Sequence, residues 1–253
     1  SGRNSEYYSE DPFIGGHIAS LECEGVASRG MYVFVKHYAI NDQEDHRGDR
    51  EGQYSIATFL NEQAAREIYL KPFEMCVKSD KVEMNYAKDN GDGTYSNATT
   101  EIPSVTGIMT SFNRVGYTWA GGNYNMITGL LRNEWGFQGL ISEDFIQDAN
   151  YVVLKEAVLN GVTMSCNTGD NTMAAVSEKY PYWTVEAVSQ DTTMMTALKQ
   201  AMKYQNYALA NSNAMDGMAS NTKLVSVRTW YDNALTAVQI VFAALTVLAV
   251  AMY

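Results

Sequence analysis

The chain has 253 residues, of which 46% are hydrophobic, enough for one large domain or two small ones. It carries 18 basic and 29 acidic residues, a net charge of −11. Since a phosphate backbone repels an acidic chain, we expect no nucleic-acid partner. The cysteines Cys23, Cys76 and Cys166 form no CxxC pair or Cys/His cluster, so we predict no metal site, no cofactor and no disulfide framework.

Four short apolar runs rich in β-forming residues are separated by segments with helical periodicity. Near-continuous apolar runs are typical of a parallel sheet covered on both faces, and the strand–helix alternation predicts an α/β fold. We predict about four βα units, part of a (β/α)₈ TIM-like barrel, and an open flavodoxin-like sheet is the structural alternative. The expected strands are 31–38, 105–112, 139–145 and 161–166, and the expected helices are 56–77, 124–135, 151–160 and 191–211.

The segment 79–104 alternates in polarity, turns at NGDG and alternates again, which predicts a β-hairpin inserted in the barrel. The glycines of that turn stand where an EF-hand loop needs acidic ligands, so we do not expect calcium there. The partial barrel domain is assigned to residues 1–212, followed by a polar linker over 213–230.

The last twenty residues, 234–253, contain no charged side chain. At about 1.5 Å rise per residue, a helix of that length spans roughly 30 Å, the thickness of a hydrocarbon core. Trp230 and Tyr231 at one end and Tyr253 at the other suit a membrane interface. A buried core helix is the alternative, but such helices are rarely apolar on every face over this length. We therefore predict a transmembrane helix over 231–253.

Polar and acidic residues follow the ends of the expected strands, where parallel α/β folds place their reactive groups. Each has a structural alternative: a Lys–His pair is often a solvated corner, and an acid after a strand often caps the next helix. Their meeting at one rim favours a site. The strand-end residues are Lys36, His37, Met109, Ser111, Phe112, Asn113, Glu143, Asp144, Ser165, Cys166 and Asn167.

Five segments in order, from Gly2 to about Asn213, resemble family 3 of the glycoside hydrolases, the β-glucosidase-like family. They are GRNSEYYSEDP, VKHYAINDQE, NEQAAREIYLKPFE, IMTSFNRVG and LRNEWGFQGLISEDF. No single segment is decisive, and the match rests on all five. A linker and a membrane span after the barrel are similar to rearranged members, in which the family's second domain precedes the barrel. The missing strands would then lie upstream of Ser1.

The resemblance implies a retaining β-glycosidase with Asp144 as its nucleophile. It implies that Arg3, Lys36 and His37 bind the hydroxyls of the nonreducing-end sugar. Met109 and Phe145 fall where the family places apolar and aromatic walls of that subsite. Phe112 stands where many members carry a tyrosine that hydrogen-bonds the nucleophile, so its site role departs from the pattern.

Glu143 is a second departure, because the family usually has Ser or Thr before the nucleophile. Successive side chains on a strand point to opposite sides, so Glu143 and Asp144 cannot both face the sugar. We expect Glu143 to pair with a neighbouring base or to perturb the nucleophile. The general acid, which the family usually takes from its second domain, is absent from this chain, with Glu44 and Glu143 the first substitutes to test.

We therefore expect a β-glucosidase- or β-xylosidase-type hydrolase that is incomplete as an isolated chain. Its expected partners are a β-glycoside or oligosaccharide, the remaining barrel and second domain from the upstream region or a partner chain, and a lipid bilayer. The alternatives are a catalytically inactive, membrane-anchored carbohydrate-binding protein and a scaffold. Lys223 and Arg228 favour a cytoplasmic barrel by the positive-inside rule. A polysaccharide substrate favours the extracellular face of a bacterial membrane, where we place the catalytic part.

Overall fold

The computed structural model of the chain describes residues 4–43, 45, 49–50, 53–54, 56–144, 152–166, 182–215 and 228–252. The chain divides into two compact units, Ser1–Gly217 and Met218–Tyr253, and each is described by itself.

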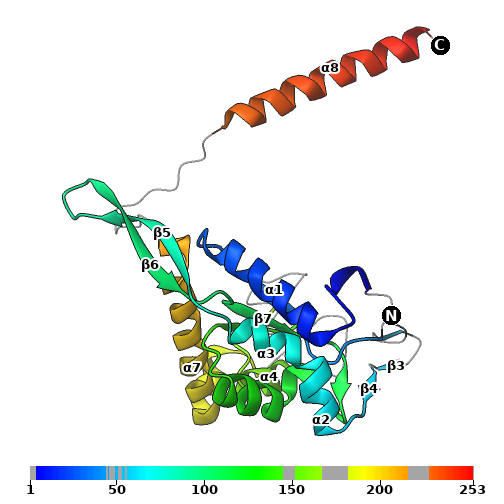
Figure 1. Cartoon of the computed structure of the whole chain (residues 1–253), viewed down its shortest axis with the longest axis vertical. Helices are drawn as coiled ribbons and strands as arrows, with labels where there is room; N and C mark the ends of the chain where they lie inside the picture. The colour runs from blue at the N-terminus through cyan, green and yellow to red at the C-terminus, as the bar shows by residue number, and fades with distance from the viewer. Residues whose placement is uncertain are drawn as a thin grey trace. The chain divides into compact units, whose positions relative to one another are not determined.

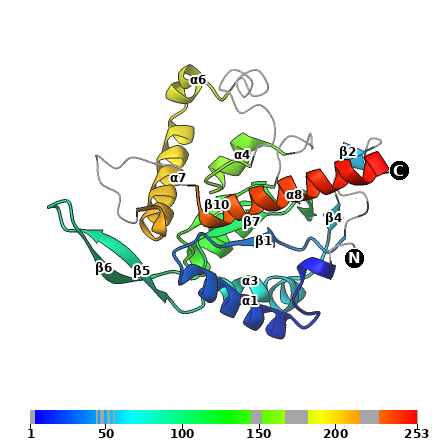
Figure 2. The same cartoon turned by 90° about the horizontal axis from the view of Figure 1, so that it is seen from above.

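The central sheet of the first unit has three parallel strands, β1 (Phe34–Tyr38), β7 (Gly107–Thr110) and β10 (Leu140–Ser142), in that order (Figure 2). Val35, Ile108 and Ile141 lie at one level across it. A parallel bridge between Ser142 and Met164 adds the fourth predicted run at the far edge. The predicted α/β order of neighbouring parallel strands is confirmed, although the fourth run contributes a bridge and no longer strand within the described residues.

Helices flank this sheet. α3 (Lys71–Val77) contacts β1, and α7 (Thr192–Ala210) contacts β10 (Figures 1 and 2). The predicted helix at 191–211 is confirmed as α7, whose first turn is capped by Asp191 accepting a hydrogen bond from the Met194 amide. The other predicted helical segments contain the π-helix η4 (Asn125–Glu134) and α4 (Leu154–Leu159), and α6 (Val185–Gln190) precedes α7.

Helix α1 (Pro12–Ala27) was not among the predicted elements. Asp11 caps it by accepting hydrogen bonds from the amides of Phe13 and Ile14, and Pro12 occupies the first helical position. Both are helix-start signals. The periodicity is obscured because α1 buries small residues against α3, whereas large apolar side chains are exposed. The exposed ones are Phe13, Ile14, Ile18 and Leu21.

The predicted helix 56–77 begins six residues too early. Ala57–Thr58 forms strand β4, which pairs in parallel with β8 (Arg114–Val115). The helical segment starts after Asn61, whose side-chain oxygen accepts a hydrogen bond from the Ala64 amide at 2.8 Å. It runs through α2 (Glu62–Ala64), the π-helix η2 (Ala65–Tyr69) and α3. A partner almost sixty residues away fixes β4, and the local pattern does not reveal it.

A β-hairpin forms within 79–104, as the alternation predicts. β5 (Val82–Asp89) and β6 (Tyr95–Ile102) pair antiparallel along their full length. Met84 and Ile102 bury themselves with Ala27 in a small cluster apart from the main core. The remaining short elements are η1 (Asn4–Glu6), β2 (Asp49–Arg50), β3 (Gln53–Tyr54), β9 (Thr118–Trp119), η3 (Ala120–Gly122) and η5 (Asn213–Met215).

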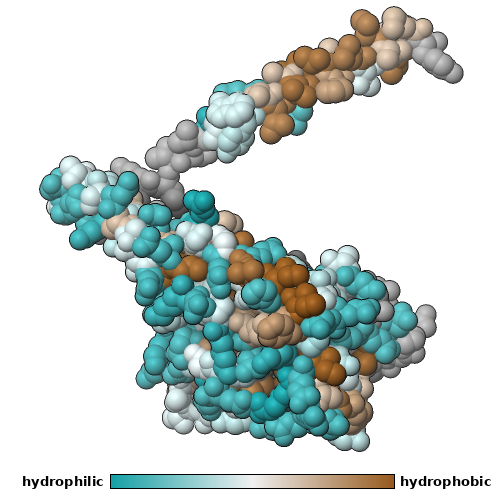
Figure 3. Space-filling model, in the orientation of Figure 1, coloured by the Kyte–Doolittle hydropathy of each residue, from teal (hydrophilic) through white to brown (hydrophobic). Residues whose placement is uncertain are grey.

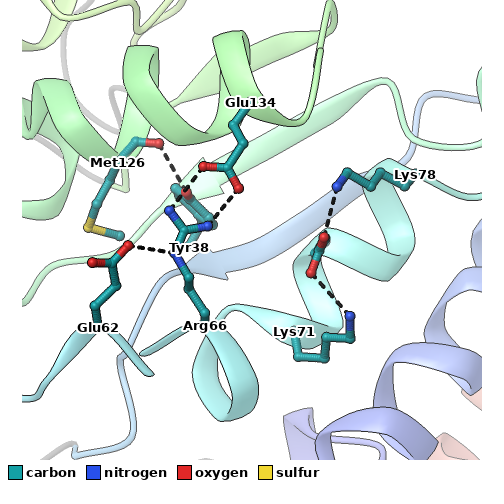
Figure 4. A network of polar contacts seen from close by, with 8 residues as sticks. Tyr38, Glu62, Arg66, Lys71, Lys78, Met126 and Glu134 are labelled. Carbon is teal, nitrogen blue, oxygen red and sulfur yellow. Dashed lines mark hydrogen bonds and ion pairs between the residues drawn. The ribbon is translucent and has the colours of Figure 1, made fainter. Parts of the chain in front are cut away.

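Polar contacts between side chains join the helical segments η2 and η4 (Figure 4). The Arg66 guanidinium donates to Glu134 at 2.6 and 2.9 Å and to Glu62 at 2.8 Å. The Tyr38 hydroxyl, fully buried below them, donates to the carbonyl of Met126 at 3.0 Å. The Arg66 pairs are partly exposed and contribute little to stability, whereas the buried tyrosine fixes the end of β1.

The second unit contains one helix, α8 (Trp230–Met252), within its described residues. It has 23 residues and a mean hydropathy of 2.3, and no part of its most apolar stretch is buried. Figure 3 shows hydrophobic side chains along most of its length. By length and composition, α8 is a candidate membrane span.

Candidate active site at the carboxyl ends of the strands

Asp144 and His37 lie side by side at the carboxyl ends of two different strands. Asp144 follows β10 and His37 belongs to β1, with β7 between them. The His37 Nε2 atom is 3.5 Å from the Asp144 Oδ2 atom, and both side chains are buried, with 6% and 4% of their surface exposed. Because both side chains are shielded from water, the attraction between an imidazole N–H and a carboxylate is stronger here than it would be at the surface.

Glu6 and Lys36 extend this pair toward solvent. The Glu6 Oε2 atom lies 3.8 Å from Nδ1 of His37 and 3.7 Å from Nζ of Lys36. The Lys36 Nζ atom also lies 3.4 Å from Nε2 of His37. Sequence reasoning missed Glu6, although it stands inside the segment GRNSEYYSEDP. An acid placed shortly before a capped helix was a usable signal.

The loop after β1 is held in place by the end of β7. The side-chain amide of Asn113 donates to the carbonyls of Ala39 and Ile40 at 3.2 and 2.9 Å. The Ser111 hydroxyl donates to Ala39 at 3.1 Å. Ile40 has φ of +62°, a left-handed conformation that a β-branched residue rarely adopts. These bonds stabilise that backbone and keep His37 at the rim.

Glu143 is fully buried. Its Oε1 atom accepts hydrogen bonds from the Ser165 hydroxyl at 3.0 Å and the Cys166 amide at 2.8 Å. Burial raises the pKa of this carboxyl. Among the described residues no base pairs with Glu143, and its two hydrogen bonds come instead from a hydroxyl and a backbone amide, both to Oε1.

The other predicted site residues differ in burial, and two of them lie outside the described residues. Met109 lies beside Ser142 in the strand register and is half-buried. Phe112 is 5% exposed and packs in the main core. Arg3 and Phe145 lie outside the described residues. The structure thus brings together Lys36, His37 and Asp144, and the roles of all these residues stay predictions.

A pocket of about 520 Å³ opens beside Lys36 and His37. Its volume is in the range of small-molecule sites, roughly 300–1,000 Å³. The polar and aromatic side chains that line it include Glu6, Tyr7, Tyr8, Asn41 and Asp42. Within the described part of the chain, no three His, Cys, Asp or Glu residues gather as a metal ligand set.

Arg132 fixes the strand that carries Asp144. This guanidinium is buried and donates to the carbonyls of Phe137 at 3.0 Å and Gly139 at 2.7 Å. It also stacks 3.7 Å from the ring centre of Tyr204 on α7. Burial lowers the pKa of Arg132 to about 10. At Gly139 a β-carbon would come within 2.3 Å of the Thr106 carbonyl oxygen, so only glycine lets β10 approach β7 there.

Comparison with known proteins identifies the chain. Residues 1–204 match the glycosyl hydrolase family 3 N-terminal domain. The chain belongs to this family. A Ruminococcus albus beta-glucosidase is 31% identical over 191 residues, 70% of this chain and 17% of that protein. An exo-alpha-(1->6)-L-arabinopyranosidase of Bifidobacterium breve is 32% identical over 70% of this chain and 20% of its own length.

A solved beta-glucosidase structure has a similar local fold. Beta-glucosidase 3B of Thermotoga neapolitana, solved in complex with glycerol, matches 84% of this chain with a TM-score of 0.62 and 25% identity. The match covers 25% of that enzyme. The chain thus spans about a fifth of the two relatives' length and a quarter of this structure.

Proposed function

We propose that this family 3 chain is the part of a retaining β-glycosidase that carries the nucleophile, Asp144. The observation that supports this most directly is the buried carboxylate of Asp144 at a strand end, with its Oδ2 atom 3.5 Å from Nε2 of His37. Relatives named beta-glucosidases support a β-glucosidase-type reaction, and a β-xylosidase type differs by one hydroxymethyl group on the sugar. The parallel strands β1, β7 and β10 would belong to a (β/α)₈ barrel completed by residues outside this chain.

In this proposal Asp144 attacks the anomeric carbon of the nonreducing-end sugar. The bond from that carbon to the leaving oxygen breaks, and the leaving oxygen takes a proton from a general acid. Water then attacks the same carbon, gives its proton to the conjugate base and releases Asp144 from the ester. Two inversions at one carbon leave the anomeric configuration unchanged.

The neighbours of Asp144 fit the first of these steps. A proton on Nε2 of His37 directed at Oδ2 would hold the carboxylate oriented and ionised. Glu6 would in turn hold His37 and Lys36, and the Lys36 ammonium would meet sugar hydroxyls. Arg3, Met109, Phe112 and Phe145 are proposed to complete the sugar subsite.

The general acid is proposed to come from outside this chain. Glu143 is unsuited to that role, since it is fully buried and its Oε1 atom already accepts two hydrogen bonds. Glu44 lies outside the described residues. An acid from a second domain, upstream in the polypeptide or on a partner chain, would meet the leaving group about 5–5.5 Å from Asp144.

Helix α8 is proposed to anchor the protein in a membrane by a single span. Its 23 residues are long enough to cross a hydrocarbon core. We place the catalytic unit on the extracellular face of a bacterial membrane, where a polysaccharide would be met. Protease protection of intact cells tests the side.

Covalent trapping tests the proposal. A 2-deoxy-2-fluoro aryl β-glucoside should leave a sugar ester on Asp144, located by mass spectrometry of the digested protein, when the chain is supplied with its remaining barrel and second domain. Asp144→Asn should take no label. An adduct elsewhere would overturn the assignment. Sugar binding without turnover or label would favour the alternative, an inactive carbohydrate-binding protein, and absence of both would favour a scaffold.

A further inference from the structure

Glu143 is an unusual residue to find beside a nucleophile, because its carboxyl is fully buried and only half satisfied. Oε1 accepts hydrogen bonds from Ser165 and Cys166, whereas Oε2 has no hydrogen-bond partner among the described residues. An orphaned oxygen on a buried anion is far more unfavourable than one on a neutral carboxyl.

The charges around Glu143 also favour its neutral form. Its titratable neighbours among the described residues include Asp144 on its own strand end and the Cys166 thiol on the facing segment, and the Asp144 charge disfavours a second carboxylate. No described Lys, Arg or His side chain forms an ion pair with Glu143. Burial is the largest cause of its raised pKa and outweighs the two bonds to Oε1.

The two bonds connect neighbouring strand ends. Glu143 directly follows β10, and Ser165 and Cys166 directly follow Met164, which bridges to Ser142. The carboxyl therefore extends the pairing of these segments by one step beyond the last backbone bridge. Asp144 is the next residue after that clamp.

We propose that Glu143 is a positioning residue that works in its neutral form: it clamps the end of β10 to Ser165 and Cys166 and so fixes Asp144 without adding a negative charge. The role assigned to Asp144 rests on the proposed function, whereas the neutral clamp does not. A Ser or Thr side chain at this place would be too short to reach the next segment.

The neutral form is tested by thermal unfolding of the 253-residue chain in detergent, with Glu143→Gln as the variant. Because the folded-state pKa of Glu143 is raised, its contribution is fully present below the unfolded pKa, about 4.3, and is lost as pH rises toward the folded value. Glutamine does not titrate and still accepts through its amide oxygen. The Tm of Glu143→Gln should therefore equal that of the wild type near pH 4 and exceed it by about 2–5 °C at pH 7.

Glu74→Gln is the matched control, since the Lys78 and Lys71 ammonium groups lower the pKa of Glu74. Glu74→Gln should therefore have a lower Tm than the wild type at pH 7, and this difference should shrink as the pH falls. The sign is opposite to that expected for Glu143→Gln. A Glu143→Gln protein that is less stable than the wild type at pH 7, with the gap growing from pH 4, would show an ionised Glu143 and overturn the proposal.

The positioning role is tested in the chain supplied with its remaining barrel and second domain. Glu143→Ala, which removes the clamp, should lower kcat by about 10–100-fold with little change in KM. Glu143→Gln should recover most of that loss and extend activity further into the alkaline range. Equal kcat for the alanine and glutamine variants would overturn the role. If the wild type itself shows no turnover, the proposed function fails, while the Tm comparison still decides the neutral clamp.

Discussion

At the scale of single residues, the adjacent carboxyls of Glu143 and Asp144 have different hydrogen-bonding and charged neighbours. Asp144 lies against the imidazole of His37, whereas Glu143 is enclosed with a hydroxyl and an amide. The pKa of Glu143 is raised by burial, so the two groups need not ionise together. Separation of two neighbouring acids by their surroundings is a common basis for assigning them different roles.

The residue that should matter most for turnover is Asp144. Asp144→Asn keeps the shape and the contact with His37 but removes the attacking carboxylate, so kcat should fall at least about 10³-fold. The measurement is the steady-state hydrolysis of an aryl β-glucoside by the chain supplied with its remaining barrel and second domain. Glu134→Gln, an exposed acid paired with Arg66, serves as the control and should leave kcat within twofold. Comparable losses in both variants would contradict the assignment.

At the scale of elements, buried polar bonds at strand ends place the site. Arg132 holds β10, and Asn113 holds the loop after β1. The Arg132 guanidinium reaches a third carbonyl, that of Gly161, at 3.4 Å and stacks on Tyr204. One side chain thus joins η4, the two segments beside β10 and α7, which makes it the best single target for a stability test.

Arg132→Met should destabilise the fold by roughly 2–4 kcal/mol, because it leaves buried carbonyls without donors. Arg66→Met is the matched control, since that guanidinium is 41% exposed and its pairs should contribute less than about 1 kcal/mol. Denaturant unfolding, followed by circular dichroism, measures both. Equal losses in the two variants would show that burial of Arg132 is not what matters.

Helix α1 should depend on its cap. Asp11→Ala removes two hydrogen bonds, to the amides of Phe13 and Ile14, and should lower the unfolding free energy by about 1 kcal/mol, or the Tm by about 2–4 °C. Its exposed neighbour Glu10 is the control, and Glu10→Ala should change the Tm by less than 1 °C, as surface substitutions roughly do. A Tm unchanged in Asp11→Ala would mean that α1 is fixed by packing alone.

At the scale of the whole molecule, the first unit contains the candidate site and the second contains α8. All the residues brought together at the strand ends belong to the first unit, and the most apolar stretch of α8 is not buried. The two units therefore make separable predictions, one about solubility and one about activity.

Truncation after Asn213 should convert a detergent-requiring protein into one that stays in aqueous solution. Phase partitioning in a mild detergent measures it: the full chain should enter the detergent phase and the truncated chain the water phase. A full chain that remains monomeric in buffer without detergent would contradict the span.

The isolated chain should hydrolyse aryl β-glycosides no faster than the Asp144→Asn variant, because the proposed general acid lies outside it. Addition of the upstream region or partner chain should restore turnover. Full activity of the 253 residues alone would require an acid among its own side chains, with Glu44 the first to substitute.

The sequence alone determined which runs become neighbouring parallel strands, because buried strands, capped helices and turns have local patterns of apolar and polar residues. It also placed Asp144 and the Lys36–His37 pair at strand ends. Only the tertiary structure decided the partners, since hydrogen bonds and ion pairs join residues far apart in sequence: His37 with Asp144, Glu6 with His37, and Glu143 with Ser165. The late start of the helix after Asn61 has the same origin, because β4 exists through its distant partner β8.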